Sequence, residues 1–327
     1  MNSVPSVVNF FMSRFCKIGL ALGGGGARGL AHLGILQELE RAEISVDFLT
    51  GSSMGALVAA VYAQSPSAAR AVDRFRSYLA SAEFKKTKID FLRSPNREEI
   101  PRWEGMFQRF ASFIRKGVFY SQSLTKQAPI SEENFTQNIN FLLDDKNLEE
   151  TAIPLAVAAL DLKSCQEVVL QKGSIRKAVS ASCAIPGIMP PIKIEEWKLV
   201  DGGWIDRVPV RPARSMGADF VIAIDVAEEL DEDTDFSTGL GIVLRTYEIS
   251  RCALSRLQVE EADLIVCPDV SQVHWSDFGH LDECVWAGAE AMREKMEEVR
   301  KRIARKKIRN FFLSPFRGKS QPAYTSG

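Results

Sequence analysis

Histidine is scarce in this chain of 327 residues, and its cysteines lie far apart. The three histidines, His32, His274 and His280, are too scattered for a zinc site. None of the six cysteines forms a C-x-x-C pair, and the N-terminus has neither a basic n-region nor a convincing cleavage site. We therefore expect reduced thiols in a cytoplasmic protein that needs no metal and no cofactor.

Long apolar runs are absent too. The longest, residues 56–63 (ALVAAVYA), has eight residues, whereas a membrane-spanning helix needs about 20. Hydrophobic residues make up 46% of the chain and charged residues 25%, which excludes a disordered or collagen-like chain. The composition is that of a globular protein that does not cross a membrane.

The chain has no large excess of charge of either sign. Its 41 basic and 42 acidic residues give a net charge of −1. Seven of the basic residues lie within residues 300–309 (RKRIARKKIR), so the rest of the chain carries 34 − 42 = −8. This distribution is not that of a nucleic-acid-binding protein. The basic segment predicts either a solvated terminal helix or peripheral contact with an anionic surface such as the inner face of a membrane.

Strands and helices alternate along most of the chain, which predicts a three-layer α/β/α fold with a mostly parallel central sheet. The apolar patterns place strands at residues 17–22, 46–50, 154–160, 167–170, 198–200, 220–226 and 262–267. They place helices at residues 27–40, 54–63, 174–183, 210–216, 240–260 and 281–309.

The same patterns predict a domain organisation. We expect an N-terminal arm at residues 1–16, a main domain at 17–295, and a basic helix and tail at 296–327. Periodicity weakens in residues 65–127, where aromatic residues accumulate. That segment is expected to form a cap that borders a site rather than part of the sheet.

A glycine loop follows the first predicted strand. Residues 24–29 (GGGARG) match G-x-G-x-x-G at the start of a helix, as in a dinucleotide-binding loop. The acid that would bind a ribose is Asp47, but it lies near the start of the second strand instead of its end. Glycines let backbone N–H groups approach a ligand, so this loop could hold a phosphate or an oxyanion. A plain strand-to-helix turn is the alternative.

A serine turn follows the second predicted strand. Residues 51–55 (GSSMG) match G-x-S-x-G between a strand and a helix, which is the setting of a nucleophile elbow. Ser53 would be the exposed nucleophile, and Gly51 and Gly55 would let neighbouring elements approach. The N–H of Met54 could contribute to an oxyanion hole. Alternatively, Ser53 only caps the helix.

The serine needs a base, and Asp201 is the candidate. It ends a short apolar strand and is followed by Gly202 and Gly203. Backbone geometry would hold this carboxylate in place and open to the site. The alternative is an aspartate in an ordinary Asx turn.

Other functions remain open from the residues alone. Asp225 followed by His274 or His280 has the order of a Ser-His-Asp triad in an α/β-hydrolase. A nucleotide-binding module or a regulatory protein without activity would also keep these motifs. The acidic residues 228–235 lack the ligand spacing of an EF-hand and predict a solvated loop.

In this order, the three motifs resemble the patatin-like phospholipase family. The chain is most similar to its compact bacterial members, which are related to the catalytic domain of neuropathy target esterase. The resemblance covers residues 17–295 and rests on five segments: GGGGARGLAHLGIL, FLTGSSMGALVAA, SASCAIPGIMPPI, LVDGG and GADFVIAIDV.

The resemblance implies a serine lipid acyl hydrolase with a Ser–Asp dyad and no catalytic histidine. Ser53 would be the nucleophile and Asp201 the general base. The amides of the loop would form the oxyanion hole, and they belong to Gly24, Gly25 and Gly26.

Other positions of the resemblance bear on the loop, the base and the substrate. Arg28 and Gly29 match the rest of the loop motif, whereas Asp206 departs from the family pattern and would add charge near the base. The substrate would be a phospholipid, a lysophospholipid or another fatty-acyl ester. From composition, the aromatic segment between Phe84 and Tyr120 would line the acyl chain.

Overall fold

The computed structural model describes residues 16–86, 132–226 and 239–313. Most of the predicted N-terminal arm, most of the predicted cap and the acidic run at 228–235 lie outside these ranges. Within the described residues, no helix is both long and apolar enough to cross a membrane.

One sheet of eight strands forms the centre of the fold, in the order β5-β6-β3-β2-β1-β7-β8, with β4 also paired to β3. Five strands are parallel: β1 (Ile18–Leu22), β2 (Phe48–Ser52), β3 (Leu155–Asp161), β7 (Phe220–Ile224) and β8 (Leu264–Val266). Three antiparallel strands complete one end: β4 (Gln166–Leu170), β5 (Ile192–Ile194) and β6 (Trp197–Asp201). The predicted mostly parallel sheet is confirmed.

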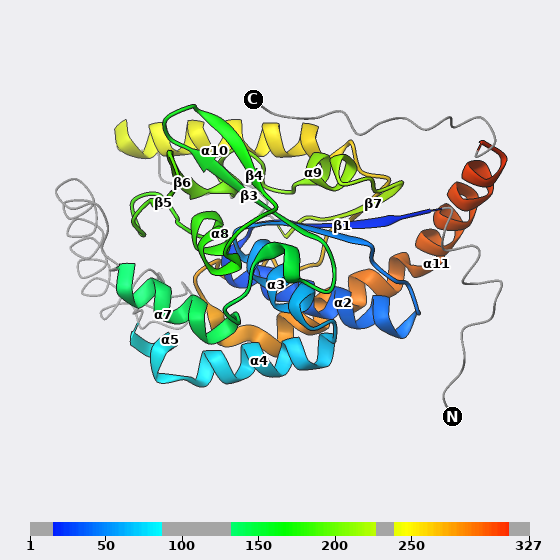
Figure 1. Cartoon of the computed structure of the whole chain (residues 1–327), viewed down its shortest axis with the longest axis horizontal. Coiled ribbons are helices and arrows are strands. Elements are labelled where there is room, and N and C mark those ends of the chain that lie inside the picture. Colours follow the sequence, from blue (N-terminus) through cyan, green and yellow to red (C-terminus); the bar gives the residue numbers. More distant parts are fainter. Residues whose placement is uncertain (1–15, 87–131, 227–238, 314–327) are drawn as a thin grey trace, which may run out of the picture.

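Helices cover both faces of the sheet, so the predicted three layers are also confirmed (Figure 1). One layer contains α2 (Ala31–Arg41), α3 (Met54–Gln64), α4 (Ala68–Ala80), α8 (Ile175–Ser182) and α11 (Leu281–Leu313). The other contains α9 (Val210–Ser215) and α10 (Gly239–Val259). Every residue of β1, β2 and β7 is buried, which explains why these strands are apolar or small throughout rather than alternating.

Some element boundaries differ from the prediction. The segment between β1 and α2 begins as a 3-10 helix, η1 (Gly26–Leu30). β2 begins two residues later than predicted and continues to Ser52, so the serine turn follows its last residue directly. The short edge strand β5 was not predicted, because three residues carry too little pattern.

The predicted cap segment contains more regular structure than its weak periodicity indicated. Its first part is α4, an amphipathic helix, followed by α5 (Ala82–Lys86). After the undescribed residues, α7 (Glu132–Leu142) packs against both. Residues of these three helices line the pocket described below, although α7 lies beyond the segment predicted as a cap.

The basic segment is not a separate unit. α11 continues without a break from Leu281 to Leu313, so the boundary predicted at residue 296 falls inside it. Val299 and Ile303 are buried among the core residues, which ties the basic part of this helix to the body of the protein.

Two glycines allow α2 and α11 to pack closely. A methyl group at Gly288 would lie 1.9 Å from the carbonyl oxygen of Ala31, and one at Gly34 would lie 1.9 Å from that of Val285. We therefore expect Gly288→Ala to lower the free energy of unfolding by about 3 kcal/mol, measured by urea denaturation. The matched control is Gly239→Ala, where a methyl group meets no atom within 4 Å. Equal stability of the two variants would contradict this packing.

The strand register brings the two predicted catalytic segments together. Ser52 of β2 pairs with Ala158 of β3, and Ala159 of β3 pairs with Asp201 of β6. Because β6 is antiparallel to β3, its last residue lies beside the carboxyl end of β2. Residues about 150 positions apart therefore meet across one strand.

Candidate active site

The glycine loop is held by backbone hydrogen bonds at its start. The N–H of Gly23 donates to the carbonyl of Ile224, and that of Gly24 donates to the carbonyl of Arg207, each at 3.0 Å. His32 Nε2 lies 2.8 Å from the carbonyl oxygen of Gly23. Burial lowers the pKa of His32 to about 4, so its ring is neutral and Nε2–H can donate to that carbonyl. His32 is fully buried in α2.

Gly24 differs from its predicted role. Its N–H is already used by Arg207, so it is not available to an oxyanion in this structure. Three other N–H groups near the nucleophile donate to no partner among the described residues, namely those of Gly25, Gly26 and Met54. Gly26 and Met54 line the same pocket as Ser53, and these three amides remain the predicted oxyanion donors.

The far end of the loop is fixed by residues from a distant segment. The N–H of Ala27 donates to the carbonyl of Trp275 at 2.7 Å, and Arg28 Nε donates to the carbonyl of Val273 at 2.6 Å. Gly26 has a φ of +58°, and a methyl group on it would lie 2.2 Å from the Trp275 oxygen. Only glycine fits there. Arg28 is 3% exposed, so it helps to fix the loop through a buried hydrogen bond to the Val273 carbonyl.

Ser53 occupies a strained turn between β2 and α3. Its backbone has φ +53° and ψ −126°, which a residue other than glycine rarely adopts. The Ser53 N–H donates to Ser182 Oγ at 2.9 Å, and the Cys183 thiol donates to the Ser53 carbonyl at 3.2 Å. The end of α8 thus holds the backbone of Ser53, the predicted nucleophile, on both sides. Sequence reasoning missed these two residues, although both lie in the segment SASCAIPGIMPPI.

The other motif glycines allow elements to come close. In each case an added methyl group would lie within 2.5 Å of another atom: Gly29 beside Met54, Gly51 beside Ala56, Gly55 beside Leu22 and Gly202 beside Ala158. Of these four glycines, Gly51 and Gly55 were predicted to let neighbouring elements approach, and both do so.

The hydroxyl of Ser53 and the carboxylate of Asp201 form the centre of the site. Ser53 Oγ donates to Asp201 Oδ2 at 2.6 Å. The other oxygen, Asp201 Oδ1, accepts the N–H of Gly203 at 2.8 Å, which is the Asx turn considered as an alternative. The turn and the dyad are therefore compatible, because each uses a different oxygen of the carboxylate.

Burial shifts the pKa of the Asp201 carboxyl toward neutral pH. Asp201 is 4% exposed, and this burial raises its pKa to about 6. Hydrogen bonds from Ser53 and Gly203, together with the charges of Arg251 and Arg207, act in the opposite direction. A carboxylate with this pKa is ionised at pH 7 and is still basic enough to accept the serine proton.

Asp206 does not add the charge expected from its position. It is 2% exposed and faces Glu167. Burial and the neighbouring Glu167 carboxylate raise the pKa of Asp206 well above its usual range. The pair therefore retains a proton near neutral pH, and the charges that act on Asp201 come from arginines instead.

None of the three histidines completes a triad. His32 bonds the loop carbonyl described above. His274 Nδ1 lies 2.8 Å from Ser276 Oγ, and His280 pairs with Asp277 and Glu283. Ser53 Oγ instead meets a carboxylate directly.

Asp47, the acid that a dinucleotide site would need, lies away from the glycine loop. Asp47 Oδ2 accepts the N–H of Ile18 at 2.7 Å. This contact lies at the start of β1, at the opposite end of that strand from the glycine loop. Asp47 therefore supports the sheet and is not placed to bind a ribose beside the loop.

An apolar pocket opens beside the nucleophile. Ser53, Gly26 and Met54 line it together with Cys183. The remaining wall comes mainly from aliphatic and aromatic side chains, including Leu57, Phe84, Phe135, Ile139, Ile188 and Phe278. Phe84, the first residue of the predicted aromatic wall, lines this pocket. Residues 87–120 of that segment lie outside the described residues.

One polar pair interrupts the apolar lining of this pocket. Tyr78 Oη donates to Asn138 Oδ1 at 3.0 Å, and Asn138 Nδ2 donates to the carbonyl of Asn134 at 2.6 Å. Because these groups satisfy one another, the pocket remains suited to a hydrocarbon chain.

Comparison with known proteins places the site in context. Residues 20–214 match the family model described as patatin-like phospholipase. Patatin-like phospholipase domain-containing protein 6 of Homo sapiens is 32% identical over 223 residues, which are 68% of this chain and 14% of that protein. Lysophospholipase NTE1 of Pyricularia oryzae is 24% identical over 317 residues, 88% of this chain and 19% of that protein.

This chain therefore spans under a fifth of the length of those two relatives. Among solved structures, VipD from Legionella pneumophila matches with a TM-score of 0.44 and 15% identity, covering 86% of this chain and 67% of that one.

Proposed function

Because this chain belongs to the patatin-like phospholipase family, we propose that it is a serine lipid acyl hydrolase that uses Ser53 and Asp201 as a dyad. The observation that carries this proposal is the 2.6 Å hydrogen bond from Ser53 Oγ to the buried carboxylate of Asp201. The serine also lines an apolar pocket of the kind that an acyl chain would fill.

The first half-reaction forms an acyl-enzyme. Ser53 Oγ attacks the ester carbonyl carbon while its proton moves to Asp201 Oδ2. The negative charge on the carbonyl oxygen is stabilised by the N–H groups of Gly25, Gly26 and Met54. When the tetrahedral intermediate collapses, the alcohol leaves with the proton from Asp201, and the acyl group remains on Ser53.

The second half-reaction releases the fatty acid. The oxygen of a water molecule attacks the acyl carbon, and Asp201 accepts a proton from that water. The second tetrahedral intermediate then collapses, and Ser53 Oγ leaves with that proton. The products are a fatty acid and the free enzyme, so one ester bond and one water molecule are consumed.

The substrate is proposed to be a lysophospholipid, a phospholipid or a related fatty-acyl ester. One of the relatives is named as a lysophospholipase, and the apolar pocket beside Ser53 matches the acyl part of such molecules. The test is release of fatty acid from lysophosphatidylcholine by the purified chain. Turnover is expected, and its absence for both this substrate and short soluble esters would overturn the proposal.

Narrowing the acyl pocket should discriminate between long and short substrates. Ile139 lines the pocket from α7, so we expect Ile139→Trp to lower kcat/KM for a palmitoyl ester by about tenfold or more, through steric exclusion. Hydrolysis of a butyryl ester should change little, because its short chain does not reach the added ring.

The matched control for Ile139→Trp is Gln137→Trp. Gln137 is exposed on the same helix, so both esters should be hydrolysed as by the wild type. An equal loss for long and short esters in Ile139→Trp would contradict the assignment of the pocket.

A further inference from the structure

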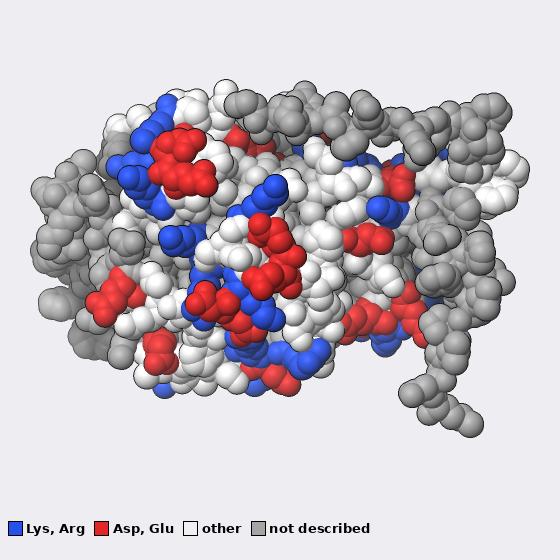
Figure 2. Space-filling model, viewed as in Figure 1, with Lys and Arg blue, Asp and Glu red and all other residues white. Residues whose placement is uncertain are grey.

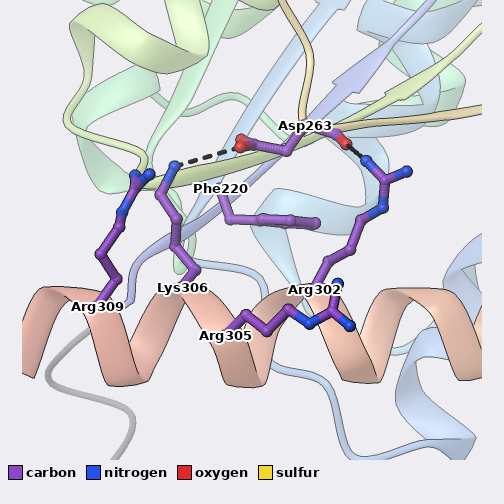
Figure 3. Close-up of a pocket in the computed structure, with 6 residues that line it drawn as sticks. All are labelled: Phe220, Asp263, Arg302, Arg305, Lys306 and Arg309. Carbon is purple, nitrogen blue, oxygen red and sulfur yellow. Dashed lines mark hydrogen bonds and ion pairs between the residues drawn. The ribbon is translucent and has the colours of Figure 1, made fainter.

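A second pocket lies far from the nucleophile, between α11 and the sheet (Figure 3). Phe220, the first residue of β7, and Asp263, which precedes β8, form its sheet side. Its helix side consists of four cationic residues, which are Arg302, Arg305, Lys306 and Arg309. We call it the α11 basic pocket.

The spacing of the four cations makes this face of the helix basic. They occupy positions i, i+3, i+4 and i+7, which share one side of an α-helix. The neighbouring stripe, which includes Val299 and Ile303, is buried, so it fixes the rotation of α11 and aims the basic side at the pocket. On the face seen in Figure 2, by contrast, acidic and basic side chains are interspersed in small groups.

The acidic groups nearby neutralise only part of this charge. Asp263 forms ion pairs with Lys306 at 3.2 Å and with Arg214 at 2.5 Å. Arg302 donates to the carbonyl of Asp263 and pairs with Glu298.

Two guanidinium groups keep their charge available. Arg305 and Arg309 form no ion pair with any of the described residues. Both are exposed on the helix, one on each side of Lys306 in the sequence. The inner cations of the pocket, Arg302 and Lys306, are thus held by Asp263, which partly neutralises their charge. The two guanidinium groups at its rim form no ion pair with the described residues.

The size and chemistry of the pocket fit a phosphate group. Its volume is about 220 Å³, below the roughly 300–1,000 Å³ of sites for drug-sized ligands. Arginine binds phosphate through two parallel N–H donors, which lysine cannot reproduce. Apart from Phe220, every residue that lines the pocket has a charged side chain, and four of these five side chains are cationic.

The location separates this pocket from catalysis. Ser53 follows the carboxyl end of β2, whereas Phe220 and Asp263 lie at the amino ends of the parallel strands β7 and β8. The two sites therefore lie at opposite ends of the parallel strands. We propose that the α11 basic pocket is a second, non-catalytic site that binds a phosphate group, carried either by an anionic lipid headgroup or by a soluble phosphate compound.

The test compares two double variants of the full chain that remove equal charge. Arg305→Gln with Arg309→Gln empties the rim of the pocket, and Arg300→Gln with Lys301→Gln removes two exposed cations of the same helix outside it. Binding is measured to inorganic phosphate by calorimetry. It is also measured by co-sedimentation with vesicles of phosphatidylcholine, with and without phosphatidic acid.

We expect the wild type to bind phosphate. In the pocket variant the Kd for phosphate should be higher by about tenfold or more, and in the control variant it should be unchanged. If vesicles containing phosphatidic acid show the same pattern, with a loss of roughly thirty-fold for two cations, the source is a lipid headgroup. This arm also tests the peripheral membrane contact predicted from the sequence. If only phosphate follows the pattern, the source is soluble.

Two results would overturn the proposal. One is a wild type that binds neither phosphate nor the anionic vesicles. The other is an equal loss in both double variants, which would show that binding follows total charge rather than this pocket. Hydrolysis of a soluble short-chain ester by the pocket variant should remain that of the wild type, so the result is independent of the proposed catalytic function.

Discussion

Replacing Ser53 with alanine is expected to reduce kcat for ester hydrolysis by about 10⁴-fold or more, because the atom that forms the acyl-enzyme is removed. The remaining hydrogen bonds of the turn, from the Ser53 N–H to Ser182 and from Cys183 to the Ser53 carbonyl, involve only its backbone. The fold should therefore survive, and circular dichroism with urea denaturation checks this. Fatty-acid release is the measurement.

The neighbouring serine provides a matched control. Ser52 is fully buried at the end of β2, and its Oγ has no hydrogen-bond partner among the described residues. Ser52→Ala removes the same atom one residue away and should retain most of the activity. If Ser52→Ala were inactive and Ser53→Ala active, the assignment of the nucleophile would be wrong.

Replacing Asp201 with asparagine should lower kcat by about 10³-fold, because an amide cannot accept the serine proton. In the proposed mechanism the ionised form of Asp201 is the base, and burial raises the pKa of this carboxyl to about 6. We therefore expect kcat/KM to be level at higher pH and to fall about tenfold for each pH unit below 6. The measurement is a pH profile with a short-chain ester. A profile that is flat down to pH 4 would contradict a base with this pKa.

Stability measurements show whether Asp201→Asn acts on chemistry or on folding. Because the pKa of Asp201 is raised on folding from 3.8 to about 6, the native state binds this proton more tightly than the unfolded state. Wild-type stability should thus fall as the pH rises from about 4 to about 6 and remain lower above that. The introduced amide carries no charge, so the variant should gain up to about 3 kcal/mol over the wild type at pH 8, and little at pH 4. A variant that is both inactive and less stable at pH 8 would point to misfolding.

The sequence predicts the proposed catalytic pair because each of its two residues lies in a local pattern. Ser53 stands in a strand–turn–helix motif, and Asp201 ends an apolar strand before two glycines. Bottom-up reasoning alone could not choose between a dyad and a triad. That choice depends on the antiparallel pairing of β6 with β3, which places Asp201 beside the end of β2.

Other features depended on long-range contacts that no local pattern encodes. Gly24 was predicted as an oxyanion donor, but its N–H is taken by the carbonyl of Arg207, almost two hundred positions away in the chain. The hydrogen bonds that Ser182 and Cys183 form with the Ser53 backbone also join distant residues, which are 129 and 130 positions apart. The raised pKa of Asp206 depends on its burial and on Glu167, which faces it only in the folded chain.

The central claim, that Asp201 activates Ser53, is tested most directly by covalent labelling with a fluorophosphonate. The adduct is located by mass spectrometry of the wild type, Ser53→Ala and Asp201→Asn at pH 7. We expect strong labelling of the wild type on Ser53, none in Ser53→Ala, and much slower labelling in Asp201→Asn. Labelling of Ser53→Ala at another serine, or labelling of Asp201→Asn at the wild-type rate, would contradict it.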